Sequence, residues 1–144
     1  MNVWQFNVWE MMNMPEEEAK HRAFYSGTHD NDTLVGFFRK LEGKETNEST
    51  EAPVADEEES IVQDSAVKQA KDAIRKIYES PAALAMVQLQ DVFMLGSEAR
   101  MNIPGLPDGN WTWRIPGDSI KDAFPDSADN AAWFRSLAEE TGRA

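Results

Sequence analysis

The pattern of hydrophobic and polar residues predicts three short strands. Residues 1–8 alternate apolar with polar side chains, as a half-buried strand does. Residues 22–25 form a second, short and aromatic segment, and residues 85–92 form a third that is largely apolar. A largely apolar run of that length is typical of a strand buried on both faces of a sheet. We therefore expect strands at these three positions.

Two segments have the spacing of amphipathic helices. Apolar residues recur at helical intervals over residues 34–41, directly after Asp32 and Thr33, either of which suits a helix cap. A second helix is expected after residues 60–63, which match the capping-box pattern. The apolar face of this second helix comprises Val67, Ala70, Ile74, Ile77 and Tyr78.

Two further helical segments are predicted nearer the C-terminus. Ser80 and Pro81 combine a cap with a proline at the first helical position, which predicts a turn of helix. Residues 131–138 predict a last helix, built around tryptophan, phenylalanine and leucine. It is expected to end before Gly142, a residue suited to a helix C-cap.

The order of these elements favours an α/β fold. Strands that alternate with amphipathic helices indicate parallel pairing through right-handed crossovers. In such folds, functional side chains gather in the loops after the carboxyl ends of the strands. Polar residues 26–32 follow one predicted strand, and residues 90–114 follow another. We therefore expect these two clusters to lie on the same rim.

The negative charge of the chain is concentrated in one segment. The net charge is −12, and residues 42–64 hold nine acidic residues and one lysine, with few bulky apolar residues among them. Such a composition cannot offset the entropy lost on ordering. Within a single domain of residues 1–144, we expect residues 42–60 to form a flexible acidic loop. An acidic interaction tail is the alternative.

Composition excludes several classes of function. Binding to nucleic acid or to an anionic membrane requires clustered lysine and arginine, and the chain is acidic. No apolar run approaches the roughly 18 to 20 residues that span a bilayer, and the start lacks the pattern of a signal peptide. The absence of cysteine rules out disulfides and thiolate metal sites. We expect a cytoplasmic protein.

Residues 26–32, Ser-Gly-Thr-His-Asp-Asn-Asp, are the first candidate site. Threonine, asparagine and aspartate favour turns and helix caps, so a structural role explains much of this stretch. His29 and Asp30 stand before the cap rather than at it, which leaves them for binding. His29, Asp30 and Asp32 lack the spacing of a helical pair of metal ligands. Neither a metal ion nor a cofactor is therefore expected.

The aromatic loop suggests the class of ligand. Trp111 and Trp113 flank one threonine, and Asn110 and Arg114 lie outside them. Sugars expose flat C–H faces that can rest on indole rings, and their hydroxyls need polar partners. This rim therefore favours a carbohydrate over a phosphate. The alternative, for either tryptophan, is that it buries the loop against the rest of the fold.

Four motifs carry a resemblance to a known family. They are, in chain order, GTHDNDT at Gly27–Thr33, QDVF at Gln90–Phe93, GSEARMNIPG at Gly96–Gly105 and GNWTWR at Gly109–Arg114. Together they resemble the last catalytic-domain motifs of the 4-α-glucanotransferases, the amylomaltases or disproportionating enzymes of bacteria and plants. Residues 1–6 also resemble the strand that precedes the histidine motif in that family.

The resemblance implies a partial (β/α)8 barrel. In that family the catalytic domain is such a barrel, and the chain is several times longer. Residues 1–144 are then the C-terminal portion of the barrel, with its last three strand–helix units and an acidic disordered insertion. Such a piece has open strand edges, so self-association through those edges is expected.

The resemblance also implies a function. Family members transfer α-1,4-glucan segments to the 4-hydroxyl of an acceptor sugar by a retaining double displacement, which needs a nucleophile and an acid/base. A third carboxylate stabilises the transition state, and it matches Asp30. His29 matches its sugar-binding neighbour, and Asn102 matches an asparagine that faces the donor sugar. Trp111 and Trp113 are expected to bind maltooligosaccharides and other α-glucans.

The family takes its nucleophile and its acid/base from earlier strands of the barrel. This chain is therefore expected to be a fragment of the enzyme, inactive by itself. Within it, Glu98 is expected to form an ion pair with Arg100. Asp91 is expected to cap or brace the loop of the third predicted strand, which the resemblance makes strand eight of the barrel. Two alternatives stay open: a stand-alone carbohydrate-binding module without catalysis, and a small acidic scaffold protein without a sugar ligand.

Overall fold

The computed structural model describes residues 14–43, 65–115, 117 and 127–144. The elements found there are, in chain order, α2 (Glu16–Ala19), β1 (Ala23–Tyr25), α3 (Leu34–Leu41), α4 (Ser65–Glu79), β2 (Leu84–Met86), α5 (Leu89–Val92), the 3-10 helix η1 (Ser97–Ala99) and α7 (Ser127–Glu140).

Some predictions lie outside the described residues. These are the strand at residues 1–8, the capping box at 60–63 and the acidic loop from residue 44 onward. The described ends of the acidic segment lie close together, because Glu42 Oε1 accepts a hydrogen bond of 2.7 Å from Gln69 Nε2. The end of α3 therefore lies beside the first turns of α4.

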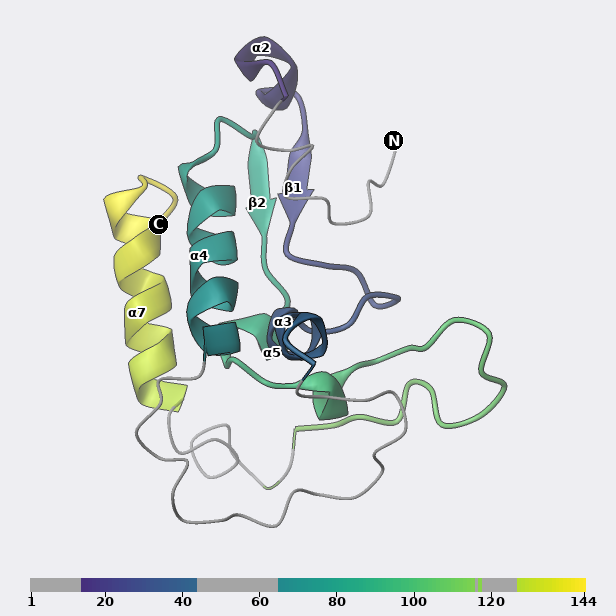
Figure 1. The fold of residues 1–144 in the computed structure, drawn as a ribbon. Helices are drawn as coiled ribbons and strands as arrows, with labels where there is room; N and C mark the ends of the chain where they lie inside the picture. The colour runs from purple at the N-terminus through teal and green to yellow at the C-terminus, as the bar shows by residue number, and fades with distance from the viewer. Residues whose placement is uncertain (1–13, 44–64, 116, 118–126) are drawn as a thin grey trace.

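β1 and β2 form a parallel pair, as the order of elements predicted (Figure 1). Ala23 pairs with Leu84 and Tyr25 with Met86. The side chains of Leu84 and Met86 are 49% and 46% exposed. The expectation of a strand buried on both faces is therefore wrong for the described residues.

The predicted third strand is also shorter than residues 85–92. β2 ends at Met86, and the chain then enters α5 at Leu89. The reason is local hydrogen bonding, because Gln88 N donates to the hydroxyl of Ser26 at 3.0 Å. Its N–H group is thereby bound by a side chain rather than by the backbone of a neighbouring strand.

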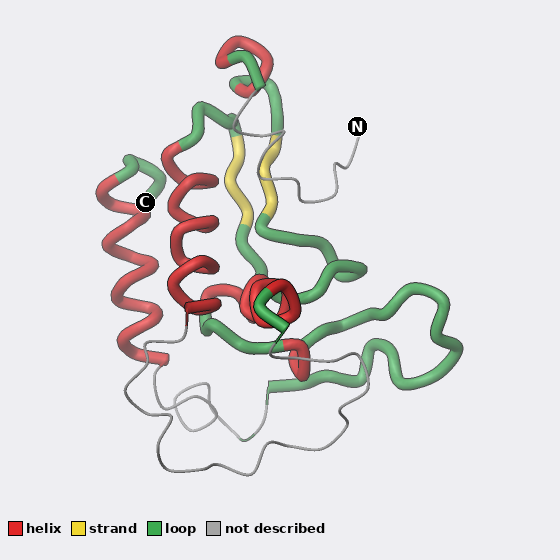
Figure 2. Tube along the Cα trace, viewed as in Figure 1, coloured by secondary structure: helices red, strands yellow, loops and turns green. Residues whose placement is uncertain are grey.

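Two long helices pack beside the strand pair (Figure 2). α4 buries one face along its whole length, which confirms the predicted amphipathic helix. Most of this face joins Leu34, Val35 and Leu137 in the larger core cluster, whereas Ile77 belongs to the smaller cluster. The buried residues of α4 are Ala66, Ala70, Ala73, Ile74 and Ile77. Among the described residues, no helix is long and apolar enough to cross a membrane.

α3 begins where its cap was expected. The Thr33 side chain accepts a hydrogen bond from Gly36 N at 3.1 Å, which satisfies one of the free N–H groups of the first turn. Leu34 and Val35 are buried, whereas Phe37 and Leu41 are 43% and 69% exposed. Only part of the predicted apolar face therefore enters the described core.

The helical turn predicted at Ser80 and Pro81 is wrong. Ser80 Oγ donates a hydrogen bond of 2.6 Å to Ile77 O, so this hydroxyl closes the end of α4 instead of capping a new helix. Arg143 then joins the end of α7 to this corner, because its guanidinium donates to the carbonyls of Tyr78, Ser80 and Ala82.

The last helix is longer than the sequence predicted, but it ends as expected. α7 spans Ser127–Glu140, and Gly142 has a φ of 67°. Arg143 N donates to Ala138 O and Gly142 N donates to Glu139 O, the two bonds of a Schellman motif. Gly142 therefore serves as the C-terminal cap.

Candidate functional site

A tight turn directly after β1 presents His29 and Asp30. Asn31 N donates to Thr28 O at 3.0 Å. The Asn31 side chain reaches back, and its Oδ1 accepts from Thr28 N at 2.8 Å and from Thr28 Oγ1 at 2.9 Å. His29 and Asp30 are thus the two central residues of a turn that Thr28 and Asn31 close.

The next two residues serve the start of α3. Asp32 Oδ2 accepts from Lys40 Nζ at 2.6 Å and from Ser97 Oγ at 2.8 Å, which joins α3 to η1. Thr33 caps the helix. Turn closure and helix capping therefore account for Asn31, Asp32 and Thr33, whereas the side chains of His29 and Asp30 take no part in either.

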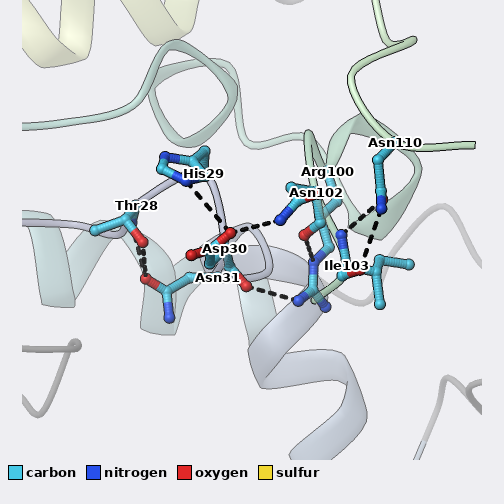
Figure 3. Close-up of polar contacts among 8 residues, drawn as sticks. All are labelled: Thr28, His29, Asp30, Asn31, Arg100, Asn102, Ile103 and Asn110. Atoms are coloured by element: carbon cyan, nitrogen blue, oxygen red, sulfur yellow. Dashed lines mark hydrogen bonds and ion pairs between the residues drawn. The ribbon is translucent and has the colours of Figure 1, made fainter. Parts of the chain in front are cut away.

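The carboxylate of Asp30 joins the two loops that were expected on one rim (Figure 3). Asn102 Nδ2 donates a hydrogen bond of 2.5 Å to Asp30 Oδ1. His29 Nε2 lies 3.3 Å from the same oxygen. The other oxygen, Oδ2, has no hydrogen-bond partner in the part of the chain that the structure describes. The side chains of His29 and Asp30 are 55% and 44% exposed, so both are accessible to a ligand.

Arg100 fixes the backbone around this contact. Its Nε donates to Asn102 O at 2.8 Å and its Nη2 donates to Asp30 O at 2.7 Å. Within the described residues, Glu98 Oε1 instead accepts a hydrogen bond from Gly96 N. The expected ion pair between Glu98 and Arg100 is therefore wrong. The sequence did not predict that Arg100 bridges the two loops. Its position two residues before Asn102 was the only feature of the sequence that could have suggested this role.

Trp111 lies against the histidine. The ring centroids of His29 and Trp111 are 4.9 Å apart, and the two ring planes are tilted by 41°. Trp111 remains 50% exposed, so much of its indole is accessible to a ligand. Trp113 is half-buried and makes no ring contact with His29 in the described part of the chain. Its role in substrate binding stays a prediction.

Asp91 lies beneath this rim, and its side chain braces the end of β1 and the start of α3 rather than the loop after the third predicted strand. Its side chain is buried, with 1% of the residue exposed. Asp91 Oδ2 accepts from Ser26 Oγ at 2.5 Å, and Oδ1 accepts from Leu34 N at 2.8 Å. One carboxyl thus ties α5 to the end of β1 and to the first turn of α3. Burial raises the pKa of Asp91, and the two hydrogen bonds partly oppose that shift.

Comparison with known proteins identifies the family. The sequence profile described as 4-alpha-glucanotransferase matches residues 1–120. The chain belongs to the 4-α-glucanotransferase family. That match covers the His29–Asp30 turn, Asn102 and both tryptophans, and it confirms the resemblance of the four motifs.

Members of the 4-α-glucanotransferase family from plants and bacteria are similar to most of this chain. The chloroplastic/amyloplastic 4-alpha-glucanotransferase of Solanum tuberosum is 35% identical over 134 residues, or 93% of the chain. That of Thermus thermophilus is 39% identical over 120 residues, or 83% of the chain. The matched regions are only 21% and 22% of those two relatives. This chain therefore spans about a fifth of their length.

The fold is also similar to that of a solved glucanotransferase. The amylomaltase of Streptococcus agalactiae, determined in complex with acarbose, has a TM-score of 0.60 and 20% identity to this chain. The similarity covers 92% of this chain and 23% of that protein. Because amylomaltase is a TIM-barrel enzyme, the likeness agrees with part of a (β/α)8 barrel.

A metal site has no support among the described residues. No group of three or more histidine, aspartate or glutamate side chains is placed there to hold an ion. His29 and Asp30 are two potential ligands on one turn. The other group that contacts the Asp30 carboxylate is the side-chain amide of Asn102. Carboxylate, imidazole and amide groups so arranged suit hydrogen bonds to hydroxyls.

Proposed function

We propose that this chain supplies part of the sugar-binding rim of a 4-α-glucanotransferase. Such an enzyme transfers α-1,4-glucan segments to the 4-hydroxyl of an acceptor sugar by a retaining double displacement. The observation that carries the proposal is the carboxylate of Asp30, which is held by Asn102 at 2.5 Å and stands beside His29. The substrates are maltooligosaccharides and other α-glucans.

Asp30 takes the role of the family's third carboxylate. Its Oδ1 is occupied by Asn102, so Oδ2 is the oxygen that would accept hydrogen bonds from the sugar hydroxyls next to the reacting carbon. A fixed negative charge beside that carbon stabilises an oxocarbenium-like transition state more than the ground state. His29 binds a further hydroxyl, and the exposed indole of Trp111 supports the apolar face of the ring. Trp113 is assigned a contact with the same glucan chain.

The nucleophile and the acid/base are supplied from elsewhere in the barrel. By the resemblance, the described strands are two of the last three strand–helix units, and the acidic loop is an insertion between α3 and α4. The chain is then a fragment of the enzyme, and by itself it binds sugar without transferring it. The alternative is a stand-alone carbohydrate-binding module without catalysis.

A chimera separates these two functions. Residues 1–120 would replace the matching segment of the Thermus thermophilus relative, and maltotriose disproportionation would be measured. We expect the chimera to be active, and Asp30→Asn to lower its kcat by about a hundredfold to a thousandfold. Asp72→Asn, which changes an exposed carboxylate on α4, is the matched control and should leave kcat unchanged.

Equal turnover by the Asp30→Asn and Asp72→Asn chimeras would refute the catalytic assignment.

A second measurement does not depend on the folding of a chimera. Acarbose is titrated into the isotopically labelled 144-residue chain, and the resonances of His29 and of the indole N–H groups are followed. We expect saturable shifts at His29 and Trp111, and their absence would refute the sugar-binding rim itself.

A further inference from the structure

One side chain closes the loop that leads from Asn102 to the tryptophans. Asn110 Oδ1 accepts a hydrogen bond of 2.8 Å from Ile103 N (Figure 3). Asn110 Nδ2 donates to Ile103 O at 3.2 Å and to Leu106 O at 3.0 Å. The loop contains no helix or strand between these points. A single amide, which has both an acceptor and a donor group, therefore joins residues seven positions apart.

The residue that follows has a strained backbone. Trp111 has a φ of 64°, in the left-handed region that bulky residues rarely adopt. Such a conformation is strained and persists only where the surroundings hold it. Trp111 N donates to Met101 O at 2.7 Å, and Trp111 O accepts from Arg114 Nη1 at 2.9 Å. Both backbone groups of Trp111 are thus held by the same loop.

Burial does not hold the indole in place. Trp111 is 50% exposed, and its ring contact in the described residues is with His29, at 4.9 Å between centroids. The direction of the indole therefore depends on the backbone of Trp111, which depends in turn on the closed loop. Without the Asn110 amide, the two carbonyls and the N–H group that it binds would turn to water, and the strain at Trp111 would be free to relax.

We infer that Asn110 is a positioning residue for the sugar platform. By closing the loop, it keeps Trp111 in the left-handed conformation that places the indole beside His29. The identity of the ligand, a glucosyl ring, rests on the proposed function. The positioning of Trp111 by Asn110 does not, because it concerns the protein without sugar.

The first test uses the 144-residue chain without ligand. In the wild type, the ring current of Trp111 is expected to displace the His29 ring protons in the NMR spectrum, because the two rings are 4.9 Å apart. The chain has two histidines to assign. We expect Asn110→Ala and Asn110→Asp to remove this displacement and to make the Trp111 indole N–H more mobile. Aspartate keeps the acceptor but loses both donors, and it faces two carbonyl oxygens. Thr112→Ala, which loses a local bond to Gly109 O, is the matched control and should preserve both signals.

The second test measures acarbose affinity and thermal unfolding together. Asn110→Ala should weaken binding about tenfold, the loss expected when an aromatic platform is displaced. Trp111→Gly should weaken binding as much, yet it should not lower the midpoint of unfolding, because glycine accepts the left-handed conformation. A pure loss of stability would not produce that combination.

Two outcomes decide the inference. An unchanged displacement of the His29 ring protons in Asn110→Ala would overturn it, as would unchanged acarbose affinity in a variant that has lost the displacement. A wild-type chain that binds no acarbose would refute the proposed function instead. The ligand-free spectra would then still decide whether Asn110 positions Trp111.

Discussion

Asn102 donates a hydrogen bond of 2.5 Å to the carboxylate of Asp30, although 72 positions separate the two residues in the chain. Hydrogen bonds to a carboxylate are charge-assisted, and such bonds are shorter and stronger than neutral ones. The bond orients the Asp30 carboxylate from a second loop, the one that follows η1. It therefore makes Asn102 and Asp30 one hydrogen-bonded unit rather than two independent side chains.

A double-mutant cycle tests that unit. Asn102→Ala and Asp30→Asn should each weaken acarbose binding to the 144-residue chain, because the first frees the carboxylate and the second removes its charge. The double variant should lose less than the sum of the single losses, with a coupling of about 0.5–3 kcal/mol. Calorimetric titration of the four proteins measures it. Additive losses would show that Asn102 does not act through Asp30.

Gly36 is expected to resist a substitution that usually stabilises helices. A Cβ atom at this position would lie 2.8 Å from Asp32 Oδ1 and 2.9 Å from Ser97 N, and it would also meet Ser97 Oγ. Gly36→Ala should therefore lower the free energy of unfolding by about 1–3 kcal/mol, where an open helical site would gain about 0.5–1 kcal/mol. Urea unfolding measures the change.

The matched control for this prediction lies on the facing element. Ser97→Gly removes the hydroxyl that the new methyl group would meet. The pair Gly36→Ala and Ser97→Gly should therefore be more stable than the sum of the single changes predicts. A Gly36→Ala variant as stable as the wild type would show that η1 does not pack tightly enough against Gly36 to exclude a methyl group.

The buried carboxyl of Asp91 should make stability depend on pH. Burial raises its pKa above the ordinary value of 3.8, so the native state holds this proton more tightly than the unfolded chain does. The contribution of Asp91 to the free energy of unfolding is then fully present below 3.8 and is lost as pH rises through the native value.

Unfolding by urea across that pH range measures the effect. The free energy of unfolding of the wild type minus that of Asp91→Asn should fall as pH rises from 3.8. The same difference taken with Asp72→Asn, an exposed site, should stay nearly constant. A difference for Asp91 that grows with pH would contradict the direction of the pKa shift.

The isolated chain is expected to bind sugar but not to transfer it. A retaining transferase needs two carboxyl groups about 5 to 5.5 Å apart around the scissile bond, and the proposal gives Asp30 the third role. Incubation of the 144-residue protein with maltotriose should yield no glucose and no longer oligosaccharides. The active chimera provides the positive control. Any transfer that Asp30→Asn abolishes would require a complete catalytic set within this chain.

The sequence by itself determined the elements whose signals are local. The amphipathic spacing of α4, a cap at Asp32 or Thr33 and the Gly142 terminus are patterns of neighbouring residues. All three are confirmed, and the structure selects Thr33 as the cap. The four motifs were sufficient to indicate the family. The acidic loop from residue 44 and the cytoplasmic location stay predictions.

Only the tertiary structure decided which polar residues meet. Periodicity could not separate Ser80 as the end of one helix from Ser80 as the start of another, because the decision rests on which carbonyl its hydroxyl reaches. The sequence suggested an ion pair with Glu98 for Arg100 and a place beside the sugar for Asn110. Their hydrogen bonds instead hold Asp30 and close the loop before Trp111. Local patterns set backbone conformation, whereas contacts between distant loops depend on how strands and helices pack beneath them. The carboxyl ends of parallel strands brought His29, Asn102 and Trp111 together.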